Sequence, residues 1–245
     1  MTSLVTAAHE RGITTLALDS PDNRNALSAR LVGELAEALD GCGRDPAVRA
    51  VVLTHTGPTF SAGADLKAPP SPYTFVALLR AIVELPKPVV ARVTGHVRAG
   101  GLGLVGACDI VATGPDADFA LTEARLGVAP AVISLTLLPR LDARAAARYY
   151  LTGERFDAAE AARIGLVTVT GPDVDEALVP VLDGLRRASP QGLAQSKRLV
   201  TARVLETFER DAEDLVRRSA SLFASAEARE GMTAFLERRD AAWVV

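Results

Sequence analysis

The segment 88–109 constrains the fold more than any other part of the chain. Residues 89–93 are apolar and rich in β-branched side chains, which predicts a buried strand. A polar turn then leads to Gly100 and Gly101, and the apolar run 102–108 predicts a buried helix. The first N–H groups of a helix lack partners, and its N-terminus carries about half a positive charge. This corner should therefore stabilise an anion, either a phosphate or an oxyanion that develops during a reaction.

The same segment contains a G-x-G-x-x-G pattern at Gly101, Gly103 and Gly106. In dinucleotide-binding proteins this pattern opens a helix directly after a strand. Here residues 94–100 separate the two elements, so we favour a small-residue helix that packs closely against a sheet. A dinucleotide-dependent oxidoreductase is a disfavoured alternative.

Composition limits the class of protein. With 245 residues, of which 49% are hydrophobic, the chain can build a substantial core. A net charge of −3 and scattered Lys and Arg residues argue against nucleic acid or an anionic membrane surface as a partner. Neither a targeting segment nor a run of about 18 apolar residues is evident, so we expect a cytoplasmic protein. The isolated Cys42 and Cys108 argue against a disulfide or a zinc site.

The predicted elements alternate between strand and helix up to about residue 188 and are helical afterwards. This order predicts an α/β protein with a core over 1–188 and a helical region over 189–245. The predicted strands cover 2–7, 13–19, 50–55, 89–93, 110–112, 119–121 and 166–169. The predicted helix caps are Ser28, Asp142, Asp157, Asp173 and Ser189. Residues 57–67 are predicted to form a loop whose small residues let a ligand approach the backbone.

Several separate motifs, in this order along the chain, resemble those of the crotonase, or enoyl-CoA hydratase/isomerase, superfamily. They lie at 25–28, 47–48, 60–65, 87–88, 100–101 with 108–109, 151–153, 161–167 and 230–235, and so cover nearly the whole chain. Residues 121–134 and 235–243 are further similar to a bacterial branch that resembles methylglutaconyl-CoA hydratase.

This resemblance implies a spiral of ββα units followed by a C-terminal helical region that forms trimers, commonly paired into hexamers. It also implies an acyl-CoA thioester as substrate, with coenzyme A as part of that substrate, and no metal ion, nicotinamide or other cofactor.

The resemblance gives the predicted anion site a chemical role. When a proton is moved beside a thioester carbonyl, negative charge builds on the carbonyl oxygen, and two fixed N–H donors stabilise it. By motif these donors are the main-chain amides of Ala64 and Gly100. For Asp65 and Asp109 we favour structural roles as loop caps.

The family's coenzyme A site maps onto two loops of this chain. The adenine would lie along the main chain from Ala62 through Asp65 to Leu66, with the phosphates near Arg24 and Lys67. The alternative for both cations is that they are solvated surface residues.

The chain keeps one of the two glutamates that hydratases of this family use. Glu123 matches the second, whereas the position of the first, three residues after Gly100, is occupied by Gly103. A partly buried carboxylate at residue 123 should have a pKa raised toward the working pH, as a proton shuttle requires. The bacterial branch that this chain resembles also tends to lack the first glutamate, and this resemblance implies hydratase-type chemistry with a single glutamate. A double-bond isomerase is the alternative, because one carboxylate suffices to move a proton between two carbons.

Three further positions are predicted near the substrate. Gly101 adjoins the predicted oxyanion amide, and Pro130 precedes helices expected to line the acyl pocket. Arg98 either binds a carboxylate at the far end of an acidic acyl group or pairs with an acid or carbonyl of the protein.

Two other classes of function stay open. A homologue that binds acyl-CoA without catalysis would keep the coenzyme A loops and tolerate the loss of Glu123. RNA binding, known for some relatives in the family, is disfavoured by the acidic balance and the absence of basic stripes.

Overall fold

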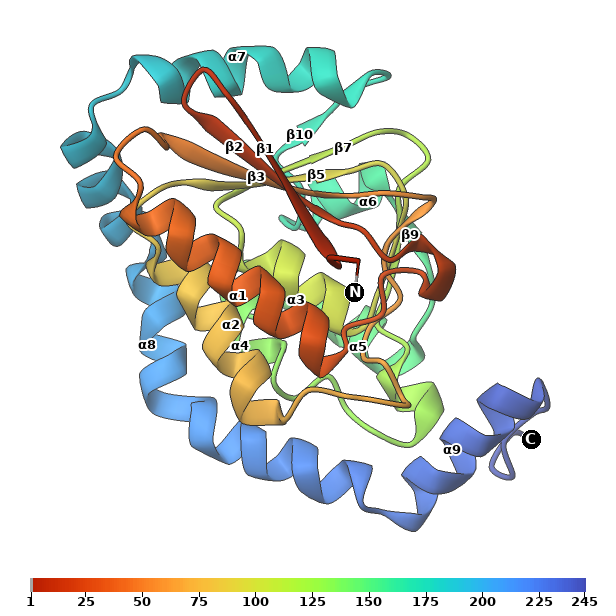
Figure 1. Ribbon diagram of the computed structural model, residues 1–245. Coiled ribbons are helices and arrows are strands. Elements are labelled where there is room, and N and C mark those ends of the chain that lie inside the picture. Colours follow the sequence, from red (N-terminus) through yellow and green to blue (C-terminus); the bar gives the residue numbers. More distant parts are fainter. Residues whose placement is uncertain (1) are drawn as a thin grey trace.

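The computed structural model describes residues 2–245 and is organised around a six-stranded sheet in the order β1-β2-β3-β5-β7-β10 (Figure 1). β1 and β2 form an antiparallel hairpin, and the other neighbours are parallel. The strands are Val5–Glu10 (β1), Ile13–Leu18 (β2), Ala50–His55 (β3), Val89–Val93 (β5), Ile110–Thr113 (β7) and Val169–Thr170 (β10). β3 is buried along its whole length, as expected for a strand covered on both faces.

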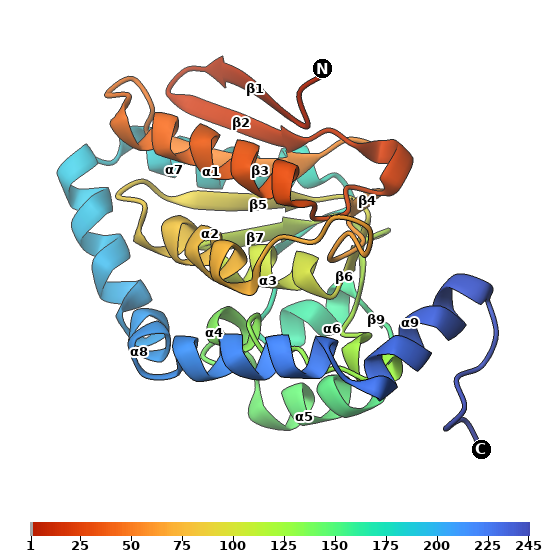
Figure 2. The same cartoon turned by 60° about the horizontal axis from the view of Figure 1, so that its bottom comes forward.

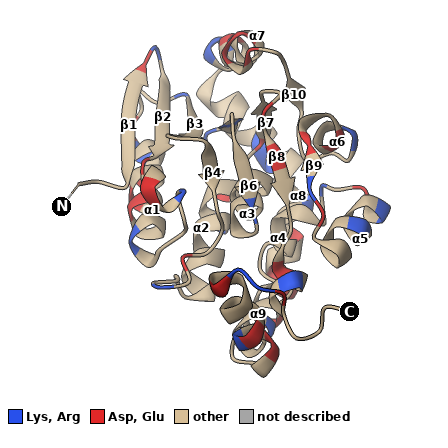
Figure 3. Ribbon diagram, turned by 90° about the vertical axis from the view of Figure 1, so that its right-hand side faces the viewer, with Lys and Arg blue, Asp and Glu red and all other residues tan. Residues whose placement is uncertain are grey.

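A second, four-stranded sheet has the order β4-β6-β8-β9. Its strands are Thr59–Ser61 (β4), His96–Arg98 (β6), Asp118–Ala120 (β8) and Phe156–Asp157 (β9). β4, β6 and β8 each follow directly after a strand of the large sheet, and a helical segment comes next (Figure 3). The predicted repetition of ββα units is therefore confirmed.

Helices cover both faces of the large sheet (Figures 1 and 2). α1 (Ala29–Arg44), α2 (Pro72–Glu84) and α3 (Gly100–Ala107) pack on one face, and α7 (Val174–Arg187) packs on the other. The remaining helical segments are Pro21–Asn23 (η1), Glu123–Leu126 (η2), Ser134–Leu137 (α4), Ala143–Thr152 (α5), Ala158–Arg163 (α6), Pro190–Phe223 (α8) and Ala226–Glu237 (α9). Every predicted cap is confirmed, because the side chain of each accepts a hydrogen bond from a backbone N–H of its helix.

Three parts of the predicted secondary structure are wrong. β4 and β6 lie in segments that were predicted as a loop and a turn, because a strand of three residues is too short to show an alternating pattern. The predicted strand 166–169 contributes only its last residue to β10. The N–H groups of Leu166 and Val167 instead donate to the carbonyl of Ala161, which closes α6. The first hairpin turns within two residues, Arg11 and Gly12, which both have positive φ, so β1 extends to Glu10.

The C-terminal helices pack against the core of the same chain. α8 contacts α2 and α4, and α9 contacts η2. The contact between α9 and η2 is close, since a Cβ atom at Gly231 would lie 2.5 Å from the carbonyl oxygen of Leu126. Within residues 2–245, no helix combines the length and the apolar character needed to cross a membrane.

A buried ion pair joins α8 to the end of α3. The Lys197 ammonium lies 2.8 Å from Asp109 Oδ2, and these side chains are 4% and 9% exposed. Lys197 also donates to the carbonyls of Ile82 and Lys87, and Asp109 accepts from the N–H of Val89. Asp109 thus has the structural role predicted for it, but it connects a strand and a distant helix rather than capping a loop.

Removal of one member of this pair leaves the other charge buried without its hydrogen-bonded partner. We expect Lys197→Met to lower the free energy of unfolding by about 3 to 5 kcal/mol in urea denaturation. The double variant Asp109→Asn with Lys197→Met should lose less. Arg44→Met, which removes an exposed pair with Asp40, is the control and should change stability very little. Equal effects of Lys197→Met and Arg44→Met would contradict this account.

Candidate active site

Two loops meet where the sequence predicts the oxyanion site. The N–H of Leu27 donates to the carbonyl of Gly63 (2.8 Å), and the N–H of Asp65 donates to the carbonyl of Leu27 (3.0 Å). Gly63 has a φ of +90°, and a Cβ atom there would lie 2.9 Å from Ala99 Cβ and 3.5 Å from the Gly100 nitrogen. The structure therefore brings the peptide preceding Ala64 next to the start of α3.

The main-chain amides of Ala64 and Gly100 donate no hydrogen bond to any group of residues 2–245. Gly100 is the first residue of α3, where the helix dipole favours negative charge, and the preceding Ala99 provides no side-chain cap. Ala99 has a φ of +47°, which strains a residue with a Cβ atom, and its N–H donates to the carbonyl of Ala120 in β8 (3.1 Å). Backbone held in this way presents donors of fixed direction.

Glu123 begins η2, three residues after Ala120. The residue is 8% exposed, and its Oε2 atom has no hydrogen-bond partner among the described residues. Burial raises the pKa of Glu123 from its ordinary value of 4.5 to about 7. The carboxyl group can therefore both accept and release a proton near neutral pH.

The side chain of Ile133 fills the space beside Gly103. A Cβ atom at residue 103 would lie 2.5 Å from Ile133 Cγ2, and Ile133 is almost fully buried. A carboxylate side chain at this position would require Ile133 to move. The other two glycines of the G-x-G-x-x-G pattern are also closely packed, Gly101 against Ser61 and Gly106 against Leu137, so the pattern serves helix packing as predicted.

The loops predicted to bind coenzyme A are tied together by the main chain. The N–H of Ala62 donates to the carbonyl of Arg24 (3.0 Å), and the carboxylate of Asp65 accepts from the N–H of Lys67 (2.9 Å). Asp65 therefore caps its loop, as predicted. The side chains of Arg24 and Lys67 are exposed and form no ion pair within residues 2–245, and Leu66 is 37% exposed. Their part in binding coenzyme A stays a prediction.

Arg98 pairs with an acid of the protein, which was one of the two predicted alternatives. Its guanidinium donates two 2.9 Å hydrogen bonds to the carboxylate of Asp118 and bonds to the carbonyls of Val97 and Asp118. Although burial opposes the effect, Arg98 and His96 lower the pKa of Asp118. Both terminal nitrogens of the guanidinium are bound by the protein, and this does not support the hypothesis that it binds a substrate carboxylate.

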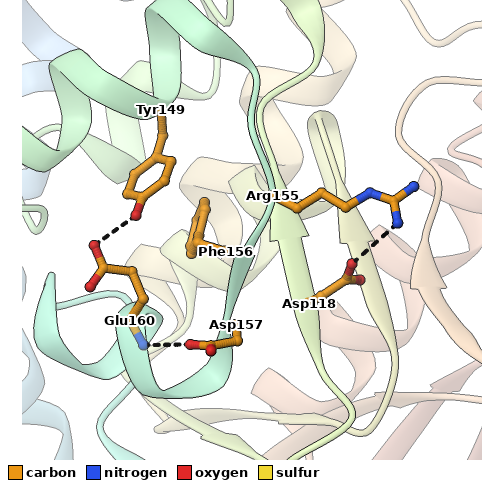
Figure 4. A pocket seen from close by; sticks show the side chains of 6 residues that line it. All are labelled: Asp118, Tyr149, Arg155, Phe156, Asp157 and Glu160. Atoms are coloured by element: carbon orange, nitrogen blue, oxygen red, sulfur yellow. Dashed lines mark hydrogen bonds and ion pairs between the residues drawn. The ribbon is translucent and has the colours of Figure 1, made fainter.

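A hollow of about 410 Å³ lies beside Asp118, where residues of β8, β9, α5 and α6 meet (Figure 4). Tyr149 points toward Glu160, and Arg155 points toward Asp118. The Tyr149 hydroxyl donates to Glu160 over 2.7 Å. None of the predicted site residues lines this hollow, so we separate it from the candidate active site.

One polar group near Glu123 was missed at the sequence level. Tyr150 in α5 is half-buried, and its hydroxyl lies 3.3 Å from Ser134 Oγ. Ser134 Oγ donates to the carbonyl of Pro130 (2.7 Å), and Pro130 is a buried residue. Only the inward position of Tyr150 in the helical pattern of α5 could have suggested this arrangement.

Three comparisons with known proteins identify relatives of this chain. The profile of the enoyl-CoA hydratase/isomerase family matches residues 8–244. The mitochondrial enoyl-CoA hydratase of Pongo abelii is 32% identical over 96% of this chain and 86% of its own. A carnitinyl-CoA dehydratase of Citrobacter koseri is 33% identical over 94% of both chains. The crystal structure of an enoyl-CoA hydratase from Mycobacterium avium superposes with a TM-score of 0.92 and 57% identity, over 100% of both chains.

The two sheets, the unpaired amides of Ala64 and Gly100 and the buried carboxyl group of Glu123 thus belong to a chain with relatives along almost its whole length. The chain belongs to the enoyl-CoA hydratase/isomerase family. Within residues 2–245, no group of three or more His, Cys, Asp or Glu side chains is arranged to hold a metal ion.

The buried carboxyl group should make stability depend on pH. Below pH 4.5 Glu123 is protonated in both the folded and unfolded states, whereas between pH 4.5 and about 7 only the unfolded state releases the proton, so stability falls as pH rises. At about 1.4 kcal/mol per pH unit, the loss is about 3 kcal/mol. The free energy of unfolding of Glu123→Gln, minus that of the parent, should therefore be higher by this amount at pH 8 than at pH 4.5. Urea denaturation at the two pH values measures this difference.

The control for this measurement is Glu206→Gln, which changes an exposed carboxylate on α8. It should follow the parent at both pH values. A parallel pH dependence of Glu123→Gln and the parent would contradict the burial of an ionisable group at residue 123.

Proposed function

We propose that the chain is an enoyl-CoA hydratase-type enzyme that adds water to an enoyl-CoA thioester or removes it from the hydrated product. The observation that carries the proposal is the buried carboxyl group of Glu123, whose Oε2 atom has no partner among the described residues. Glu123 begins the element that follows β8, the strand that holds Ala99 next to the free amide of Gly100. The amides of Ala64 and Gly100 would hold the thioester oxygen while negative charge develops on it. Glu123 would move the proton between water and the carbon next to the carbonyl.

One carboxylate is enough for the proton transfers of this reaction. As the water oxygen bonds to the β-carbon, Glu123 takes one of its protons, and the electrons of the double bond move onto the thioester oxygen. When the enolate collapses, Glu123 returns that proton to the α-carbon. A group with a pKa of about 7 suits both steps, because neither protonation state is strongly favoured at neutral pH.

A double-bond isomerase is the second candidate, and the packing around Gly103 favours it. Ile133 fills the space in which a second carboxylate would have to lie. Isomerisation needs no water, and a single carboxylate suffices to take a proton from one carbon and return it to another. A non-catalytic acyl-CoA-binding protein is less well supported, because binding alone gives no reason to bury an unpartnered carboxyl group at an energetic cost.

Coenzyme A would lie along the loop containing Ala62 and Leu66. The side chains of Arg24 and Lys67, which come from two loops joined by a main-chain hydrogen bond, would contact its phosphates. Both cysteines are free and buried, which is compatible with the expected cytoplasmic location.

We also propose that the chain forms a homo-oligomer, a trimer or a hexamer. Large apolar side chains are exposed on or beyond the last two helices: Leu199, Val200, Phe223, Phe235, Leu236 and Trp243. Contact with further copies of the chain would remove this apolar surface from water.

A panel of linear, branched and acidic enoyl-CoA thioesters tests the reaction. We expect the parent to add water to at least one of them, and Glu123→Gln to lower kcat by about 10²- to 10⁴-fold. Water addition and double-bond migration are followed separately. Migration without hydration would establish the isomerase alternative, and binding without any turnover would establish the non-catalytic one.

The coenzyme A site is tested by Lys67→Ala. Because a phosphate contact is made equally in the ground state and the transition state, we expect KM to rise about 5-fold with little change in kcat. Arg198→Ala, which removes an exposed cation on α8, is the control. An unchanged KM would remove Lys67 from the site.

A further inference from the structure

The hydroxyl of Tyr150 is held in a defined direction by a short chain of hydrogen bonds. Ser134 has a single hydroxyl proton, and it donates that proton to the carbonyl of Pro130 (2.7 Å). The 3.3 Å contact between Ser134 and Tyr150 must therefore use the tyrosine proton. The lone pairs of the phenolic oxygen are left free to accept a hydrogen bond.

The helix that carries this oxygen, α5, packs against η2, the segment that begins with Glu123. The two elements are tied by the Arg125 guanidinium, which donates to the carbonyl of Thr152 (2.8 Å). Burial and the nearby Glu123 carboxylate both raise the pKa of Tyr150, so the phenol stays neutral throughout the working range of the enzyme. Tyr150 can hold a hydrogen bond there but cannot act as the base.

Water that adds to a double bond has two protons. Each needs a hydrogen-bond acceptor while the oxygen atom approaches the β-carbon. Oε2 of Glu123 provides one acceptor, since it has no partner among the described residues. Residue 103 is a glycine and supplies no second carboxylate, and a side chain there would require the buried Ile133 to move. Tyr150, on the helix that packs against η2, carries a hydroxyl near enough to Glu123 for the two charges to interact.

We propose that the phenolic oxygen of Tyr150 accepts a hydrogen bond from the proton that water keeps, and equally from the hydroxyl group of the hydrated acyl-CoA. This assignment rests on the hydratase function proposed above and names the residue that binds the oxygen being added or removed. Tyr150 thus orients the attacking water, Glu123 removes the other proton, and no proton passes to the tyrosine.

The test compares the affinities of two thioesters, a 3-hydroxyacyl-CoA and the saturated acyl-CoA of the same chain length. We expect Tyr150→Phe to weaken binding of the hydroxylated compound about 3- to 12-fold, the range for loss of one hydrogen bond, and to leave the saturated compound unaffected. Water addition should slow by at least the same factor.

Tyr149→Phe is the matched control, because it removes the same atom from the neighbouring residue, whose hydroxyl faces Glu160 in the hollow of Figure 4. It should bind both thioesters as the parent does. If Tyr150→Phe binds both compounds as the parent does, or weakens both equally, the role of Tyr150 is refuted.

The experiment gives different results when the proposed hydratase function is wrong and when only the role of Tyr150 is wrong. A parent protein that adds water to no thioester refutes the proposed function itself. A parent that adds water, loses this activity in Glu123→Gln and keeps it in Tyr150→Phe with unchanged affinities refutes the tyrosine assignment alone.

Discussion

The contact between Gly63 and the peptide joining Ala99 to Gly100 is the constraint on which the site depends. It is possible only because residue 63 lacks a Cβ atom and adopts a positive φ. The two loops come from different ββα units, so their amides converge only after both sheets have formed. The geometry at the thioester oxygen is therefore a property of the whole fold, although each loop can be recognised locally.

The carboxyl group of Glu123 is connected to this contact through the second sheet. The N–H of Ala99 bonds to β8, and η2 follows β8 within three residues. The same burial that isolates Glu123 from water raises its pKa to about 7, so the fold is destabilised by the group it positions. Stability lost at such a residue is typical of a functional site, and the surrounding apolar core offsets it.

Elements with strong local signals could be predicted from the sequence, and those that depend on distant partners could not. The helix caps and the buried strand β3 have patterns in consecutive residues. β4 and β6 have three residues each and exist because they pair with each other. The amides of Ala64 and Gly100 were identified through family motifs. Tyr150 was missed because its partner Ser134 lies sixteen residues away in a different helix.

The packing of α9 on η2 makes the end of the chain a support for the residue that moves the proton. Gly127 and Gly231 let the two backbones approach so closely that neither position has space for a side chain. Glu123 is held from one side by β8 and from the other by a helix that ends eight residues before the C-terminus. A change that disturbs α9 should therefore lower the catalytic rate while the central sheet remains folded.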